Sequence, residues 1–241
     1  MRYLIKFSYD GTKFHGFQRQ VNVKNVQKTL EDALSKILGE SIEIKGSGRT
    51  DAGVHALMQC AHFDYDGKLT IDIIGKINTA LKGEIVINEF KKVNNDFHAR
   101  HDVKKKIYVY KINNGKYRKA YEGYFYQVKY PLDIMMMKKA CRLFIGEHDF
   151  HNFVSGFRID YTTYIYKVKI KKKGDIILIK FVGTGFYRYM VRHLVGALLD
   201  VGKGKVDATI IENMLNNPHL DKKLSVAPAD GLYLTKIVFW C

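Results

Sequence analysis

The sequence predicts an α+β fold, and three observations support this prediction. Short segments of alternating apolar residues are interleaved with segments whose apolar residues recur at helical spacing. Glycines follow the helical segments and are typical helix ends. In the first half the order is strand, helix, strand, strand, helix, strand, which is the order of a ferredoxin-like unit, a fold that commonly supports RNA binding.

The elements of the first half follow from local patterns. Tyr3, Ile5 and Phe7 alternate along a first strand at 2–8, which suits a strand that is largely buried on one face. A helix begins at Asn25, since its apolar residues fall on one face, and Gly39 ends it. The remaining strands predicted for this half are 42–45, 58–65 and 85–93, with a second helix at 71–81.

The second half begins after a hinge predicted at 96–101. A basic stretch at 104–106 precedes a strand at 107–112, in which Tyr108 and Tyr110 lie on the same face because side chains alternate along a strand. The other predicted elements are a strand at 123–130, a helix from Pro131 to Ile145, a hairpin at 164–172 and 175–182, a helix reaching 201, a short helix at 207–216 and a last strand at 231–240. We therefore expect two halves, 1–100 and 101–241.

Charge and composition indicate a polyanionic partner. Lys and Arg number 40 against 24 Asp and Glu, which gives a formal net charge of +16, and 13% of the residues are aromatic. Basic groups beside aromatic side chains are typical of nucleic-acid binding. A source organism whose proteins are all rich in lysine would produce the same balance, so composition alone leaves that alternative open.

Cysteine usage and hydropathy favour a protein of the reduced cytoplasm. Cys60, Cys141 and Cys241 are scattered and form no CxxC pair, so neither a disulfide framework nor a zinc site is indicated. The pair His148 and His151 has no further ligand cluster around it, and we expect no metal. No apolar stretch approaches the ~20 residues that span a bilayer, so no membrane association is expected.

The loop at 46–56, Gly-Ser-Gly-Arg-Thr-Asp-Ala-Gly-Val-His-Ala, is the main candidate for chemistry. Its glycines allow positive φ and close backbone approach, which a loop needs when it presses a side chain against a ligand. Asp51 is the candidate catalytic group, and Arg49 could pair with it or with a phosphate. Taken alone, the same pattern also fits a turn whose Asp caps the next helix.

Two further loops carry groups that suit RNA. The loop at 9–20 holds aromatic, amide and basic residues between two glycines, a mixture that stacks on bases and binds phosphates, although it also fits an ordinary polar connection. The stretch 183–193 places glycines before a helix, and a helix start of this kind is an anion site. Arg188 and Arg192 lie one turn apart there.

In this order the motifs resemble the tRNA pseudouridine synthase A family, nearly end to end. The resemblance is carried by Tyr9-Asp10-Gly11-Thr12, by Gly48-Arg49-Thr50-Asp51-Ala52-Gly53-Val54-His55, by Phe97-His98-Ala99-Arg100, by Met190-Val191-Arg192 and by Gly231-Leu232-Tyr233-Leu234. It implies two ferredoxin-like halves that form a shared central antiparallel sheet with helices on one side. It also implies a homodimer that isomerises uridines 38, 39 and 40 in the anticodon stem-loop of tRNA.

The resemblance also assigns roles to residues. It implies Asp51 as nucleophile, Tyr108 as the base-stacking residue with a possible part in proton transfer, and Arg192 as the ion-pair partner of Asp51. The expected substrate-binding residues, which contact phosphates or the base, are Tyr108, Arg49, His55, Arg100, Phe186, Arg188, Leu232, Gln18 and Arg19. For any single basic residue, a surface salt bridge is the alternative.

Conversion of uridine to pseudouridine breaks the C1′–N1 bond and forms a C1′–C5 bond without net redox, so no cofactor is expected. The chain has Gly183-Thr184-Gly185-Phe186 where relatives usually have Gly-Asn-Gly-Phe, which leaves the identity of the RNA open. The alternatives are a paralogue that acts on another RNA, such as ribosomal RNA, and a non-catalytic RNA-binding protein on the same scaffold.

Overall fold

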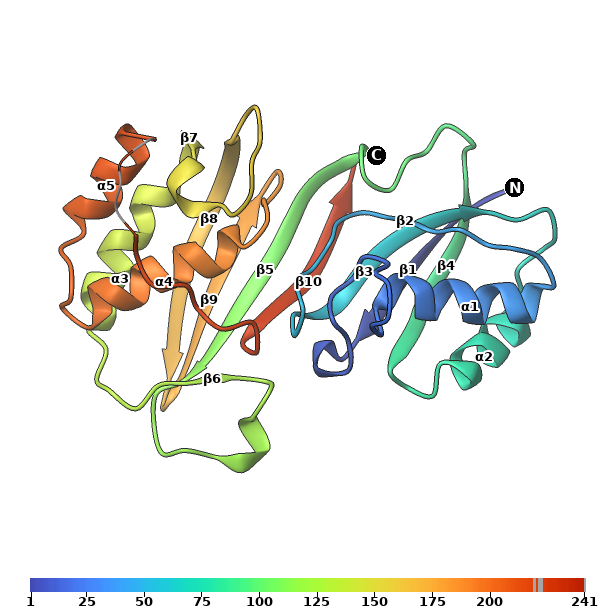
Figure 1. Ribbon diagram of the computed structural model, residues 1–241, viewed down its shortest axis with the longest axis horizontal. Helices are drawn as coiled ribbons and strands as arrows, with labels where there is room; N and C mark the ends of the chain where they lie inside the picture. The colour runs from blue at the N-terminus through green and yellow to red at the C-terminus, as the bar shows by residue number, and fades with distance from the viewer. Residues whose placement is uncertain (219, 221–222, 241) are drawn as a thin grey trace. The chain divides into compact units, whose positions relative to one another are not determined.

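The computed structural model describes residues 1–218, 220 and 223–240, and Cys241 lies outside this part. The chain divides into two compact units: residues 1–104 with 234–241, and residues 105–233. The ten strands and five α-helices of the described residues make an α+β fold, which confirms the predicted class (Figure 1). The last strand, β10 (Leu232–Phe239), runs from the second unit into the first.

The sheet of the first unit has the order β4-β1-β3-β10. Its strands β1 (Arg2–Tyr9), β3 (His55–Asp64) and β4 (Ile85–Val93) pair antiparallel, with β1 between the other two. The short β2 (Lys45–Gly46) pairs with β3. Strand order β4-β1-β3-β2 around two crossover helices is the ferredoxin-like arrangement that the element order predicts.

Two helices cover this sheet. α1 (Val26–Leu38) begins after Asn25, whose side chain accepts a hydrogen bond from Lys28 N, and it ends at Gly39 with φ 78°. α2 (Ile71–Ala80) is capped in the same way by Thr70. Both ends of α1 therefore lie where the cap and stop residues predict them. Figure 1 shows α1 and α2 lying together beside the strands of this unit.

In the second unit the strand order is β5-β9-β8-β7. β5 (Val103–Asn113) pairs antiparallel with β9 (Ile176–Gly183), and β8 (Thr162–Lys173) and β9 form a hairpin around Gly174. β7 (Gly146–Asp149) pairs with the start of β8, a strand that the sequence pattern does not predict. The helices are α3 (Ile134–Ala140), α4 (Met190–Gly202) and α5 (Thr209–Asn216).

The predicted strand at 42–45 is wrong, because only Lys45–Gly46 forms a strand there. Ile42 and Ile44 are buried as a strand pattern requires, but their N–H groups bond to side chains of α1: Ile42 N donates to Ser35 Oγ at 2.9 Å, and Ile44 N donates to Glu31 Oε1 at 3.0 Å. Side-chain acceptors thus replace the strand partner, and apolar periodicity cannot reveal that.

Two other predicted elements are markedly shorter in the structure. In place of a strand at 123–130 there is only β6 (Tyr126–Gln127), since Tyr124 N and Phe125 N both donate to Tyr121 O and close a turn. α3 ends at Ala140 rather than at Ile145, and a 3-10 helix (Cys141–Phe144) follows. Short 3-10 segments commonly tighten a helix end, where apolar spacing continues although the hydrogen bonding changes.

Candidate active site

The loop that carries Asp51 connects β2 to β3 and is anchored to β3 at its start. Ser47 N donates to Cys60 O at 2.8 Å, and Gln59 Nε2 donates to Gly48 O at 3.1 Å. Val54 N donates to Asp51 O at 3.1 Å, which closes a tight turn, and Gly53 in this turn has φ 79°. The Asp51 side chain is partly exposed at the bend, so this carboxylate lies on a fixed backbone and remains accessible.

The segment after β1 packs against the other side of the loop. Phe17 N donates to Thr50 O at 3.0 Å, and the hydroxyls of Tyr9 and Thr50 lie 2.7 Å apart. Burial raises the pKa of Tyr9 to about 12, so the phenol stays neutral at ordinary pH. A Cβ on Gly11 would lie 2.4 Å from Val54 O, a close approach that only glycine permits. The loop at 9–20 therefore supports the residues on both sides of Asp51.

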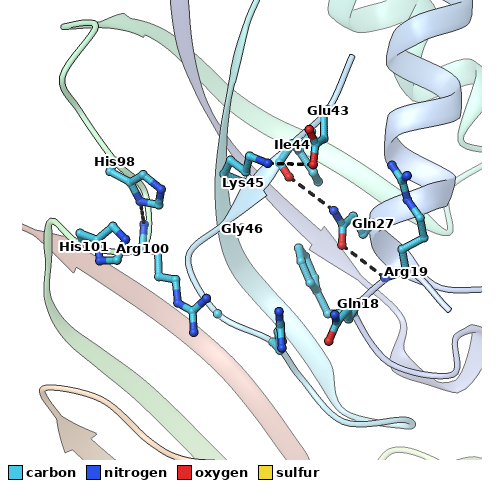
Figure 2. A pocket seen from close by; sticks show the side chains of 13 residues that line it. Gln18, Arg19, Gln27, Glu43, Ile44, Lys45, Gly46, His98, Arg100 and His101 are labelled. Carbon is cyan, nitrogen blue, oxygen red and sulfur yellow. Dashed lines mark hydrogen bonds and ion pairs between the residues drawn. The ribbon is translucent and has the colours of Figure 1, made fainter. Parts of the chain in front are cut away.

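A pocket of about 420 Å³ opens beside this loop, entirely within the first unit. Its walls include three side chains singled out from the sequence, Arg19, Arg49 and Arg100, together with Gln18. Figure 2 shows the Arg100 side chain extending toward the segment that follows Gly46. Four of the predicted substrate-binding residues thus line one cavity, although they come from three separate stretches of the sequence.

The cations of the pocket differ in their pairing. Arg19 pairs with the buried carboxylate of Glu31, and Lys45 pairs with Glu43 at 2.7 Å. Within the described part of the chain, neither Arg49 nor Arg100 forms an ion pair or a side-chain hydrogen bond. Two guanidinium groups at the pocket are therefore available for an external anion, and Arg is well suited to bind phosphate oxygens.

Two histidines near the pocket, His62 and His98, have lowered pKa values. Burial lowers the pKa of His62 to about 4, and its Nδ1 accepts a hydrogen bond from Ala99 N at 3.1 Å. Burial also lowers the pKa of His98, whose Nδ1 accepts from Arg100 N at 3.1 Å. These two rings accept hydrogen bonds from the backbone of Ala99 and Arg100, and they thereby hold the turn that carries Arg100.

In the second unit, Tyr108 lies in β5 and is 8% exposed. Its ring meets the ring of Phe186 edge to face, with centroids 5.2 Å apart. Gly183 allows this packing, because a Cβ there would lie 2.9 Å from the Phe186 ring. Both aromatic residues predicted at the site therefore lie in one cluster, and edge-to-face packing fixes their orientation.

Arg192 lies in the first turn of α4 and is held by the segment that precedes β10. Its Nε donates to Ala227 O at 2.8 Å, and its guanidinium carbon lies 4.5 Å from the centroid of the Tyr189 ring. Tyr189 has φ 60°, a left-handed conformation that costs free energy for a residue with a side chain. Residues in strained backbone conformations cluster at functional sites, so the start of α4 is a candidate functional element.

The chain was compared with models of known protein families. The family model for tRNA pseudouridine synthase matches residues 5–102 and 140–239. The chain belongs to the tRNA pseudouridine synthase family. This membership confirms the resemblance and the enzyme class, an isomerase, that the motifs predict.

Curated relatives of this family match the chain along nearly its whole length. The tRNA pseudouridine synthase A of Thermoanaerobacter sp. (strain X514) is 38% identical over 240 residues, which are 98% of this chain and 98% of the relative. The tRNA pseudouridine synthase A 1 of Bacillus cereus is 40% identical over 235 residues, 95% of each chain. The tRNA pseudouridine synthase A of Mycoplasma genitalium is 35% identical over 240 residues, 99% of this chain and 98% of the relative.

Three further residues that the family resemblance assigns to the site, His55, Leu232 and Arg188, differ in their exposure to solvent. His55 is 2% exposed, and its Nδ1 accepts from Gly11 N at 3.1 Å, so this ring is part of the anchor under the loop. Leu232 is buried at the start of β10. Arg188 is exposed, with its guanidinium 5.2 Å from the Tyr189 ring. Of these three, only Arg188 is placed to meet a ligand.

Several residues that support the site were not predicted from the sequence. Glu31 sits at 3% exposure behind the pocket, where it receives Arg19 and the backbone of Ile44. Its position on the apolar face of α1, between Leu30 and Leu34, was the available signal, because a buried charge must be paired. Tyr189 and Asp200, in contrast, carry no local pattern that separates them from surface residues.

Among the described residues, no helix is long and apolar enough to cross a membrane, and no group of three or more His, Cys, Asp or Glu side chains is arranged to hold a metal.

Proposed function

We propose that this chain isomerises uridine to pseudouridine in the anticodon stem-loop of tRNA, with Asp51 as the nucleophile. The observation that carries the proposal is the position of Asp51 in a chain of the tRNA pseudouridine synthase family: its carboxylate lies on a loop held from two sides. Gly48 and Arg49 of the same loop line the pocket, where Arg49 and Arg100 form no ion pair with any residue that the structure describes. A carboxylate can act as a covalent nucleophile. With a reference pKa of about 3.9, an aspartate is ionised at neutral pH.

The proposed reaction is balanced without a cofactor. The C1′–N1 bond breaks, the base rotates, and a C1′–C5 bond forms, while N1 gains a proton and C5 loses one. Asp51 attacks either C6 of the base or C1′ of the ribose, or it assists elimination at the sugar. The target nucleotide must leave its stack to reach the carboxylate, which costs a few kcal/mol.

The pocket supplies the binding energy for the RNA backbone in this proposal. Arg49 and Arg100 contact phosphates, with Arg19 and Gln18 at the same wall. Tyr108, oriented by Phe186, stacks on the extruded base, and its hydroxyl is a candidate for removing the C5 proton. Arg192 is proposed as the cation that pairs with Asp51 and keeps it ionised. We further propose that the enzyme works as a homodimer in the cytoplasm, which sedimentation and fractionation would test.

The proposed function is tested with tRNA that carries tritium at C5 of uridine, because isomerisation releases that tritium to water. The purified protein should release tritium from tRNA isolated from a strain that lacks the gene, and mapping should place new pseudouridines in the anticodon stem-loop. Release only from ribosomal RNA would move the activity to another substrate. Binding without any release would favour the non-catalytic alternative.

The role of the Tyr108 hydroxyl gives a separate prediction. Tyr108→Phe keeps the ring and its contact with Phe186, so tRNA affinity should stay within about threefold of wild type. If the hydroxyl transfers a proton, the turnover rate should fall by about a hundredfold or more. Single-turnover tritium release measures this. Tyr65→Phe, which removes a hydroxyl from a tyrosine of the first unit, is the control and should leave the rate unchanged. A wild-type rate for Tyr108→Phe would leave stacking as the residue's role.

A further inference from the structure

The outer face of β8 carries a row of lysines. Val168 and Ile170 are buried, and the residues that alternate with them, Lys167, Lys169 and Lys171, are exposed. Because side chains alternate between the two faces of a strand, these three lysines share one face and follow one another at about 6.7 Å along the strand. On the other face the apolar residues of β8 are buried, and α3 contacts this strand.

The neighbouring strand adds a cation to this face. β9 places Lys180 directly opposite Lys169, while the buried Ile179 lies opposite Ile170. Like charges directly across a strand pair are destabilising. In the part of the chain that the structure describes, none of Lys167, Lys169, Lys171 and Lys180 forms an ion pair. The chain therefore keeps a concentrated positive charge on an open sheet face without an internal counter-charge.

An aromatic pair lies at one end of this row. The rings of Tyr164 and Tyr166 have centroids 4.9 Å apart and are 40% and 46% exposed. Tyr164 and Tyr166 share the outer face because they alternate with the buried Ile165, and a register shift between Ile165 and Lys167 places Lys167 on the same face. Glu147 of β7 is an acidic residue paired with Tyr164. It therefore lies at the tyrosine end of the row, away from Lys169 and Lys171. Exposed aromatic rings next to a basic row are the two parts of a single-stranded nucleic-acid site.

We propose that this face, defined by Tyr164, Tyr166, Lys167, Lys169, Lys171 and Lys180, is a second RNA-binding surface that grips the sugar–phosphate backbone of the tRNA outside the pocket beside Asp51. The lysines neutralise successive phosphates, and the tyrosine pair stacks on an unpaired base at the end of the row. Charge complementarity selects RNA as the occupant, because a second copy of this face would bring lysines against lysines. The surface deepens the proposed function and rests on it only for the identity of the RNA.

The test compares two variants of equal charge. Lys167→Gln with Lys169→Gln and Lys171→Gln removes the row, and Lys36→Gln with Lys68→Gln and Lys76→Gln removes three exposed lysines of the first unit. Each phosphate contact contributes about 0.7 to 0.9 to the slope of log affinity against log salt. The β8 variant should therefore lower that slope for tRNA by about 2 and weaken binding at low salt by about tenfold or more, while the control keeps the wild-type slope.

Three results separate the outcomes. Equal slopes for the two variants would overturn the proposal and leave the lysines as a solvated surface. A change of oligomeric state in sedimentation, with tRNA affinity unchanged, would also overturn it and make the face a contact between copies of the chain. A reduced slope in a protein that releases no tritium would support the surface and reject the isomerase proposal, so the two can fail separately. Tyr166→Ala should in addition weaken binding to a single-stranded RNA by about tenfold, since stacking is lost.

Discussion

Asp51→Asn is expected to abolish pseudouridine formation, with a fall in rate of at least about a thousandfold. The amide has almost the shape of the carboxylate but cannot act as a nucleophile, so the chemical step is lost. The loop should keep its conformation, because hydrogen bonds between backbone groups anchor it, such as Ser47 N to Cys60 O and Phe17 N to Thr50 O. Binding of tRNA should stay within about tenfold of wild type, the scale of one peripheral contact.

Single-turnover release of tritium from tRNA labelled at C5 of uridine checks this result, with affinity measured in parallel by filter binding. Asp72→Asn is the matched control, since it makes the same chemical change on the exposed first turn of α2 and should leave the rate unaltered. Release at the wild-type rate by the Asp51 variant would remove Asp51 from the mechanism. Loss of binding together with activity would indicate an unfolded loop rather than a missing nucleophile.

The fold was predictable where local signals and tertiary structure agree. α1 begins and ends at the residues predicted from Asn25 and Gly39, because a side-chain cap and a left-handed glycine are encoded within a few residues. β2 was not predictable to the same degree, since the N–H groups of Ile42 and Ile44 bond to the side chains of Ser35 and Glu31 in the preceding helix α1 rather than to a strand. Periodicity records burial, and burial does not reveal the hydrogen-bond partner.

For the candidate site, too, some features were predictable from the sequence and others were not. A glycine-rich loop around Asp51 was visible in the sequence, and its motif led to the family. The arginines at 19, 49 and 100 were visible only as basic residues, and the fact that they line one pocket depends on how α1, β2 and the turn after β4 pack. Which of them is already paired also depends on packing, because Arg19 meets Glu31 whereas Arg49 and Arg100 remain available in the described structure.

Gly196→Ala is expected to be the most destabilising single methyl addition in the second unit. A Cβ at this position of α4 would lie 1.7 Å from the carbonyl oxygen of Ser225, which is backbone and cannot move alone. Ser225 is fixed by the buried Asp200, which accepts hydrogen bonds from its N and Oγ, both at 2.8 Å. Displacing this segment also strains the bond from Arg192 Nε to Ala227 O.

Overpacking typically costs about 1 to 3 kcal/mol, and a strained buried hydrogen bond adds about 1 kcal/mol or more. We therefore expect a loss of about 3 kcal/mol in the free energy of unfolding, measured by urea denaturation. Pseudouridine formation should fall as well, because Arg192 loses the carbonyl that orients it.

Gly75→Ala is the control, since Gly75 lies within α2 with no atom within 4 Å of the added Cβ. This substitution should stabilise the protein by about 0.5 to 1 kcal/mol, because alanine favours the helix more than glycine does. If the methyl group lowers the free energy of unfolding at Gly196 and raises it at Gly75, the contact with Ser225 accounts for the loss of stability at Gly196. If Gly196→Ala were as stable as wild type, the segment at 225–227 would have to sit farther from α4 than the structure places it, and the support it gives to Arg192 would be lost with it.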